Sequence, residues 1–416
     1  MPSRAADLAR AAACAVDADL VVELAQSLVR IDSVVRPATG GGEAACVAWL
    51  ESYLRGRGLA PVVHEVLPGR PNLVVDVPFA GRPGRGRRRR LLFEGHTDVV
   101  TEGDLALWTR DPFGAEIVDG RLYGRGACDM KGGLAAALAA IDALRRVAPD
   151  LPGDIRLACL ADEEGMMRGV KRFIEEGLAR DVDGAIVCEP EELELCLVQK
   201  GAMRVVVDLT GRMAHGAMPY AGANPVPAAA EVVRGAVRLD EEIRARMGVH
   251  PYLGAPYLTP TILAAPPAGE AQLNVVPARA RVGLDVRTIP GQDHRALERD
   301  LCALAAGAVA ASPGVSAEVT VVDDRPVVET PPDARVVRAL EAACPIALGR
   351  PPRYGGVPGS TDGTFLAAWA GVPVVVVGPG TRTVPHQADE WVGVDDLVAS
   401  ARLYAAAAVL FLMEDE

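Results

Sequence analysis

The chain has 416 residues, half of them hydrophobic, which exceeds one ordinary core and predicts two domains. A formal net charge of −12 argues against a nucleic-acid-binding surface, which needs clustered positive charge. No apolar run approaches membrane-spanning length, and Asp17 and Asp19 interrupt the Ala-rich N-terminus, so neither a membrane anchor nor a secretory signal is expected. Eight scattered cysteines without a CxxC pair indicate reduced thiols in a cytoplasmic protein.

Apolar runs of strand length alternate with longer helical patterns in the first half of the chain. A basic run, Arg87 to Arg90, is interpreted as a solvated loop before the first of these strands, with a nucleic-acid signal as the alternative. The alternating elements are a helix leading into 20–29, a strand at 91–100, a helix at 131–147, a strand at 155–161, a helix at 169–178 and a strand at 184–190. Strands rich in Val, Leu and Ile without polar alternation are typical of a parallel sheet covered on both faces, which predicts an α/β fold.

The pattern changes after residue 200. The predicted elements are strands at 203–211, 278–290 and 316–324, helices at 225–247 and 293–310, and a Pro/Gly-rich loop at 248–270. This order predicts a compact α+β unit with antiparallel strands. A strand at 373–380 then returns to the buried parallel type. We therefore expect an inserted domain, 201–324, within a main domain made of 1–200 and 325–416.

Carboxylates and histidines recur where the predicted strands end, and loops at strand ends of an α/β fold converge on one crevice. The residues at these positions are His96, Asp98, Asp129, Glu163, Glu164, Glu189 and His386. Imidazoles and carboxylates without a thiolate suit zinc, with cobalt or manganese as substitutes. The carboxylates outnumber the needs of one metal, which favours a two-metal site bridged by one of them.

The acidic stretch "ADEEG" follows the strand at 155–161 directly. Successive side chains diverge at the end of a strand, so one glutamate can bind a metal while its neighbour faces the attacking water. Nearby cations lower the free-energy cost of packing adjacent carboxylates. The doublet is therefore predicted to supply one metal ligand and one general base.

The motifs "GHTDVV", "GRGACDMKGG", "ADEEG", "CEPE" and "PHQADE" occur in this order along the chain. They resemble the M20 metallopeptidase family, in particular its acetylornithine deacetylase and succinyl-diaminopimelate desuccinylase branch. The similarity covers nearly the whole chain and extends to "GRMAHGAMPYAGANP", "LNVVPARARVGLDVRTIPG" and "GSTDGTFLAAWAGVP". It implies a zinc-exopeptidase-like fold, with a mostly parallel sheet between helices and an inserted α+β lid that also forms a homodimer.

The resemblance implies two zinc ions per chain. The implied ligands are His96 and Glu189 for one ion, Glu164 and His386 for the other, and Asp129 as the bridge. Asp98 would hydrogen-bond to His96 and orient it. Glu163 would be the general base, and the peptide bond after Asp129 is often cis in this family.

The resemblance also assigns residues to the substrate. His215, from the inserted domain, matches a histidine that reaches the partner subunit's active site and stabilises the oxyanion. Asn274 and Arg287 match substrate-binding positions, and a loop with Ser360 and Thr361 lines the family's pocket. A structural ion pair is the alternative role for Arg287.

Two loops depart from the family pattern. "GMMRG" at 165–169 replaces a loop that commonly has a small or hydroxyl residue, and Gly216 and Ala217 stand where serine is frequent. Both loops are expected to border the pocket, so specificity can differ from that of the named enzymes.

Three hypotheses for function follow. The first is a deacylase that hydrolyses small-molecule N-acyl amino acids such as N-acetyl or N-succinyl compounds, and the second is a dinuclear zinc carboxypeptidase or dipeptidase. Glu189 favours the first, because aminopeptidase and dipeptidase relatives often carry aspartate there. The third is a non-enzymatic binding protein, and the presence of Glu163 and of a complete ligand set argues against it.

Overall fold

The structure is a computed structural model, and the residues that it describes are 4–36, 41–83 and 87–413. The chain divides into two compact units. The first unit comprises Met1–Val198, Glu329–Val357 and Thr361–Glu416, and the second comprises Gln199–Val328 and Pro358–Ser360. The predicted insertion, 201–324, lies inside the second unit.

A nine-stranded sheet forms the centre of the first unit, in the order β1-β2-β6-β3-β7-β17-β8-β15, with β16 beside β8. Its four central strands are parallel neighbours: β6 (Asp154–Leu160), β3 (Arg90–His96), β7 (Gly184–Val187) and β17 (Val374–Val376). The remaining strands are β1 (Val62–Leu67), β2 (Arg70–Pro78), β8 (Leu195–Gln199), β15 (Val328–Glu329) and β16 (Tyr354–Val357). The predicted mixed α/β fold with a mostly parallel central sheet is confirmed.

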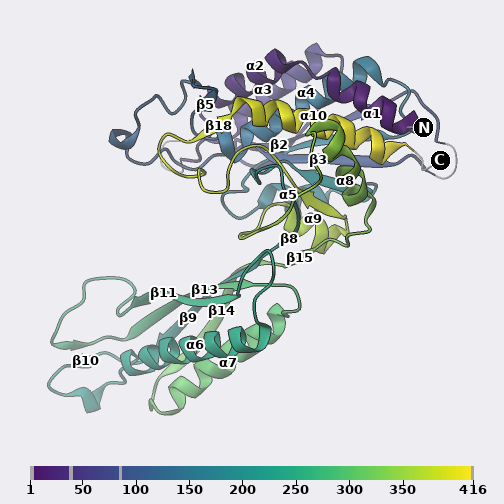
Figure 1. Cartoon of the computed structure of the whole chain (residues 1–416). Helices are drawn as coiled ribbons and strands as arrows, with labels where there is room; N and C mark the ends of the chain where they lie inside the picture. The colour runs from purple at the N-terminus through teal and green to yellow at the C-terminus, as the bar shows by residue number, and fades with distance from the viewer. Residues whose placement is uncertain (1–3, 37–40, 84–86, 414–416) are drawn as a thin grey trace. The chain divides into compact units, whose positions relative to one another are not determined.

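Helices cover both faces of this sheet (Figure 1). On one face lie α1 (Arg4–Cys14), α2 (Ala18–Val29), α3 (Ala44–Gly56), α4 (Gly132–Val147), α8 (Arg335–Ala347) and α10 (Val394–Leu412). On the other lie α5 (Arg168–Glu175) and α9 (Gly363–Ala370). Leu91 and Phe93 of β3 pack in the first core and Leu92 packs in the second. Alternate side chains of a strand point to opposite faces, so a two-faced core requires the continuous apolar run seen in the sequence.

The second unit is a one-sided layer. Its antiparallel sheet has the order β11-β13-β9-β14, with α6 (Val226–Met247) and α7 (His294–Ala310) packed on one face. The strands are β9 (Gly201–Thr210), β11 (Tyr257–Ala264), β13 (Arg279–Thr288) and β14 (Ser316–Arg325), and a two-stranded ribbon joins β10 (Ala214–His215) to β12 (Val275–Val276). Met203 and Val205 of β9 are buried in the core, whereas Arg204 between them is exposed.

One prediction about this architecture is wrong. The segment 248–270 is not only a loop, because Tyr257–Ala264 forms β11 and pairs with β13. Pairing with a neighbouring strand outweighs the local signal of Pro260 and the flanking prolines, which is tolerated because β11 lies at the edge of the sheet. The basic run leads into β3, and Arg87 is exposed, while ion pairs join Arg87 to Asp183 and Arg88 to Asp154.

A three-stranded sheet, in the order β18-β5-β4, joins distant segments near the strand ends. It contains β4 (Ile117–Val118), β5 (Arg121–Tyr123) and β18 (Trp391–Gly393). All eight cysteines are free, and six of them are buried. No helix within the described ranges is both long enough and apolar enough to cross a bilayer.

Candidate metal centre

The predicted ligands come from five separate segments of the first unit. His96 is the last residue of β3, Glu164 follows β6 and Glu189 follows β7. Asp129 lies in the tight turn η2 (Ala127–Lys131) just before α4, and His386 lies between β17 and β18. The peptide bond from Asp129 to Met130 is cis, as the family resemblance implies. The carboxyl ends of the parallel strands thus bring these side chains to one edge of the sheet.

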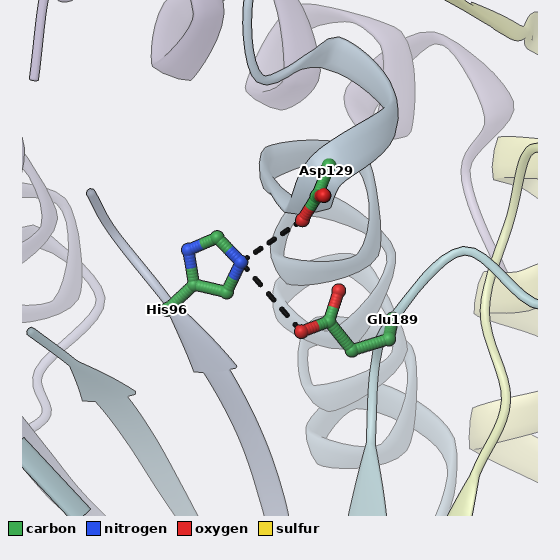
Figure 2. Close-up of side chains that lie close together, drawn as sticks. All are labelled: His96, Asp129 and Glu189. Atoms are coloured by element: carbon green, nitrogen blue, oxygen red, sulfur yellow. Dashed lines mark hydrogen bonds and ion pairs between the residues drawn. The ribbon is translucent and has the colours of Figure 1, made fainter. Parts of the chain in front are cut away.

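Three donors form the first group: His96, Asp129 and Glu189 (Figure 2). His96 Nε2 lies 3.0 Å from Asp129 Oδ1 and 3.6 Å from Glu189 Oε1. Figure 2 shows both carboxylates directed at this one ring nitrogen. His96 and Glu189 are buried, so the group is built into the core.

Asp129 also belongs to a second group, with Glu164 and His386. His386 Nε2 lies 3.0 Å from Glu164 Oε1 and 3.4 Å from Asp129 Oδ2. The two oxygens of Asp129 therefore face different histidines. In each group the candidate ligand atoms lie within 4.8 Å of one another. This arrangement fits two cations about 3.5–4 Å apart that share one bridging carboxylate.

Electrostatics support the same interpretation. Burial raises the pKa of Glu189 and of Glu163 well above the usual range, so carboxylates are crowded in a place that lacks positive charge. Burial alone would lower the pKa of His96, but neighbouring carboxylates outweigh it and raise that pKa well above its usual value. Hydrogen bonds to Asp129 and Glu164 raise the pKa of His386 to about 10. Divalent cations would supply the missing charge.

Asp98 holds two predicted site residues at once. Its carboxylate accepts hydrogen bonds from the main-chain amides of Glu163 and Glu164, each at 3.2 Å. The contact with His96 runs chiefly through the main chain, because Nδ1 lies 2.9 Å from Asp98 O and 3.6 Å from the carboxylate. A carbonyl oxygen can only accept a hydrogen bond, so Nδ1 of His96 carries the proton. Nε2 of His96 faces the other two candidate ligands, Asp129 and Glu189.

Glu390 also holds main-chain amides of the site, in this case those around Asp129, although the sequence analysis did not single it out. Its carboxylate accepts from the main-chain amides of Cys128 at 2.9 Å and of Asp129 at 3.0 Å. It is also paired with the buried Arg125 at 2.5 Å. Glu390 closes the motif "PHQADE", which was the available signal, and β18 begins one residue later. It fixes the turn that presents Asp129.

His215 and Asn274 are neighbours in the second unit. Both are exposed, and β10 and β12 place them side by side, with Gly216 N donating to Asn274 O at 2.7 Å. A Cβ at Gly216 would lie 2.9 Å from that oxygen, which explains glycine in place of the frequent serine. His215 Nδ1 accepts from Ala217 N at 3.0 Å, so Nε2 is the nitrogen left to donate.

The other predicted substrate contacts are engaged within their own units. Arg287 binds Asp285 through two nitrogens, at 2.7 and 3.2 Å. Ser360 Oγ donates to Lys200 O. Thr361 is buried, and its Oγ1 accepts from Gly363 N at the start of α9.

One departure from the family pattern has a structural explanation. Met167, in the "GMMRG" loop, is fully buried in the core beneath α5 and α9. Met167 itself therefore does not line a pocket, whereas Gly165 of the same loop lines one together with Asp98 and Glu164. Arg168, the next residue in the loop, is exposed.

Comparison with known proteins adds to this geometry. The sequence model of Peptidase family M20/M25/M40 matches residues 92–409. The chain belongs to the M20 peptidase family. Its relatives include succinyl-diaminopimelate desuccinylase from Caulobacter vibrioides, which is 32% identical over 400 residues covering 92% of this chain and 94% of the relative. The desuccinylase from Rhodospirillum centenum is 31% identical over 398 residues, with 92% and 95% covered. The protein is thus a metal-dependent amidohydrolase.

Solved structures of M20 proteins share the fold. An M20 metallo-carboxypeptidase from Sulfolobus solfataricus superposes with a TM-score of 0.74 at 20% identity, covering 94% of this chain and 99% of that one. A dinuclear metal-binding M20 peptidase from Bacillus subtilis gives 0.69 at 16% identity, with 95% and 98% covered. At these identities the likeness concerns the fold.

Proposed function

We propose that this protein hydrolyses the amide bond of N-acyl amino acids with two zinc ions per chain. The observation that carries the proposal is the pair of donor groups that share Asp129. Glu163, next in sequence to the donor Glu164, is buried and interacts electrostatically with both His96 and Asp129. The relatives support an N-acyl substrate, because they are named as desuccinylases of succinyl-diaminopimelate, an acylated amino acid.

The ligand assignment follows from the two groups. The proposed ligands are His96 and Glu189 for one ion, Glu164 and His386 for the other, and Asp129 for both. When bound, a zinc pair would polarise the amide carbonyl and lower the pKa of water. Cobalt or manganese would serve the same donors.

Glu163 would carry the proton. Its carboxylate would accept a proton from the attacking water and then donate it to the nitrogen of the leaving amine. Glu164 cannot share this role, because its Oε1 already faces His386 at 3.0 Å. Asp98 holds the main-chain amides of both glutamates and keeps base and ligand in fixed directions.

His215 would stabilise the oxyanion. Its Nδ1 is occupied by the amide of Ala217, so an Nε2 donor faces outward from an exposed loop. We propose that this donor serves the active site of a second copy of the chain in a homodimer. Asn274, its neighbour, would contact the same substrate.

Arg287 would bind the substrate's carboxylate. A guanidinium binds carboxylates through two parallel hydrogen bonds, and Asp285 now occupies that position. The substrate would therefore displace or share the contact with Asp285. Ser360 and Thr361 would line the same pocket through the loop that precedes α9.

A dinuclear carboxypeptidase or dipeptidase is the second candidate, favoured by the shared fold with the Sulfolobus carboxypeptidase. The test is a panel of N-succinyl, N-acetyl and N-formyl amino acids alongside dipeptides, assayed by amine release with zinc-loaded enzyme and with Glu163→Gln as blank. We expect an N-acyl amino acid to give the highest kcat/KM. Faster cleavage of dipeptides would replace the deacylase with the peptidase.

A further inference from the structure

The acidic turn after β6 contains a third carboxylate, Asp162, that binds no candidate metal. Asp162 is 4% exposed and has a φ of 66°, an uncommon backbone conformation for a residue other than glycine. Its Oδ2 accepts from Met166 N at 3.2 Å and from Arg168 N at 3.3 Å. The side chain of Asp162 therefore closes the turn from within.

A second buried carboxylate meets this turn from another part of the chain. Glu43, just before α3, has a fully buried side chain. Its Oε1 accepts from the main-chain amide of Asp162 at 3.0 Å. Two carboxylates thus hold one turn, and both would be unstable in the core without a cation.

Arg70, the first residue of β2, supplies that cation. Its Nη1 lies 2.6 Å from Asp162 Oδ1, and its Nη2 lies 2.7 Å from Glu43 Oε1. Its Nη2 also lies 3.8 Å from Asp98 Oδ2. The planar guanidinium can address these acceptors at fixed angles, which a lysine ammonium cannot.

Arg70 is therefore linked to every carboxylate that holds the main chain of the catalytic doublet. Asp98 binds the amides of Glu163 and Glu164, and Glu43 binds the amide of the residue before them. The side chain of Arg70 is only 13% exposed, and its ion pairs are with Glu43, Asp98 and Asp162 rather than with Glu163 or Glu164, so its effect passes through these partners.

We propose that Arg70 is a positioning residue that sets the directions of the general base Glu163 and the metal ligand Glu164. The general-base part of this inference rests on the proposed function. Loss of a group that supports metal ligands typically lowers activity or metal affinity by about 10–100-fold. A purely structural ion pair would instead affect stability alone.

The chain offers a matched control for that distinction. Arg156 of β6 is 8% exposed and also pairs with two carboxylates, Asp76 at 2.6 Å and Asp181 at 3.0 Å. Strand β6, which contains Arg156, pairs with strand β2, which contains Arg70. Arg156 lies opposite Asp76, away from the end of β6 where the acidic turn begins. A second arginine remains near each cluster after either removal, because Arg168 lies 3.8 Å from Asp162 and Arg90 pairs with both Asp76 and Asp181.

The experiment compares Arg70→Met, Arg70→Lys and Arg156→Met with the unchanged protein. Thermal unfolding, kcat and KM on the best N-acyl amino acid, and Co²⁺ affinity by titration of metal-free protein are measured for each. We expect both methionine variants to lose thermal stability. Only Arg70→Met should lose kcat by roughly 10–100-fold with a smaller change in KM, and its weaker Co²⁺ site should lose affinity. Arg70→Lys should recover part of the loss.

Several outcomes would overturn the inference. An unchanged kcat and Co²⁺ affinity in Arg70→Met, or an equal loss of kcat in Arg156→Met, would show a structural role only. If Arg70→Met does not fold, Arg70→Lys and the double variant Arg70→Met, Glu43→Gln decide, because they leave less unpaired charge. If the unchanged protein cleaves no N-acyl amino acid, the proposed function fails, and the Co²⁺ titration still tests Arg70.

Discussion

His96 in the first unit is 1% exposed and lies within 3.6 Å of two other predicted ligands, whereas His215 in the second unit is exposed on a two-residue strand. Core strands and buried carboxylates fix the first histidine before any ligand arrives. The second is fixed only within its own ribbon. The comparison teaches that the proposed metal ligands are preorganised by the fold, while the proposed substrate-binding residues of the second unit are held only by their local contacts.

The largest expected effect is in the buried region. Glu163→Gln keeps the size of the side chain but removes the base, so kcat should fall by roughly 10²–10⁴-fold. Metal content should stay as in the unchanged protein, since Glu163 belongs to neither donor group. Steady-state kinetics and metal analysis check this. Metal loss in Glu163→Gln with metal retention in Glu164→Gln would mean that the two roles are reversed.

Substitution of the exposed His215 should lower kcat without affecting metal content. His215→Ala removes an oxyanion donor, which lowers kcat by roughly 10²–10³-fold. Thermal stability and metal content should not change, because His215 contacts no buried core.

Co-expression of His215→Ala with Glu163→Gln sharpens this test. A mixed dimer contains one site with both residues intact, so part of the activity should return. No recovery in verified mixed dimers would show that His215 acts within its own chain or does not act.

Glu390→Gln tests whether the turn around Asp129 depends on its buried clamp. The amide keeps the shape but presents N–H groups to main-chain donors, so metal affinity should fall by about 10–100-fold. The loss should exceed that of a matched exposed change, Glu318→Gln. Unchanged zinc affinity, measured by competition with a chelator, would show that metal binding does not depend on Glu390.

Arg287→Met should have the smallest effect, and it should appear in KM. A hydrogen bond to a charged group contributes about 1.5 kcal/mol or more, which corresponds to about a tenfold rise in KM. The kcat should change little, because Arg287 lies in the second unit and binds no candidate ligand. A fall in kcat without a rise in KM would give Arg287 a structural role with Asp285.

The candidate metal ligands could be predicted because His and carboxylate side chains stand at the ends of continuous apolar runs. Strands β3, β6 and β7 are formed by such runs. The runs are continuous because helices cover both faces of the sheet, so side chains on both faces are buried. β11 could not be predicted in the same way, because Pro260 and neighbouring prolines hide a strand that exists only through pairing with β13.

The supporting residues could not be predicted from local pattern. Glu390 meets the main-chain amide of Asp129 across 261 positions, and Arg70 meets the carboxylate of Asp162 across 92. The ion pair of Arg88 with Asp154 could not be predicted for a related reason, since Asp154 becomes a neighbour only when β3 and β6 align.

Metal stoichiometry tests the central claim most directly. The purified protein, after mild dialysis, should carry close to two zinc ions per chain by elemental analysis, because Asp129 offers one oxygen to each donor group. His386→Ala should keep one ion, and Asp129→Ala should keep neither at full affinity. Fewer than one ion per unchanged chain, with no gain of activity on adding zinc or cobalt, would contradict the two-metal centre.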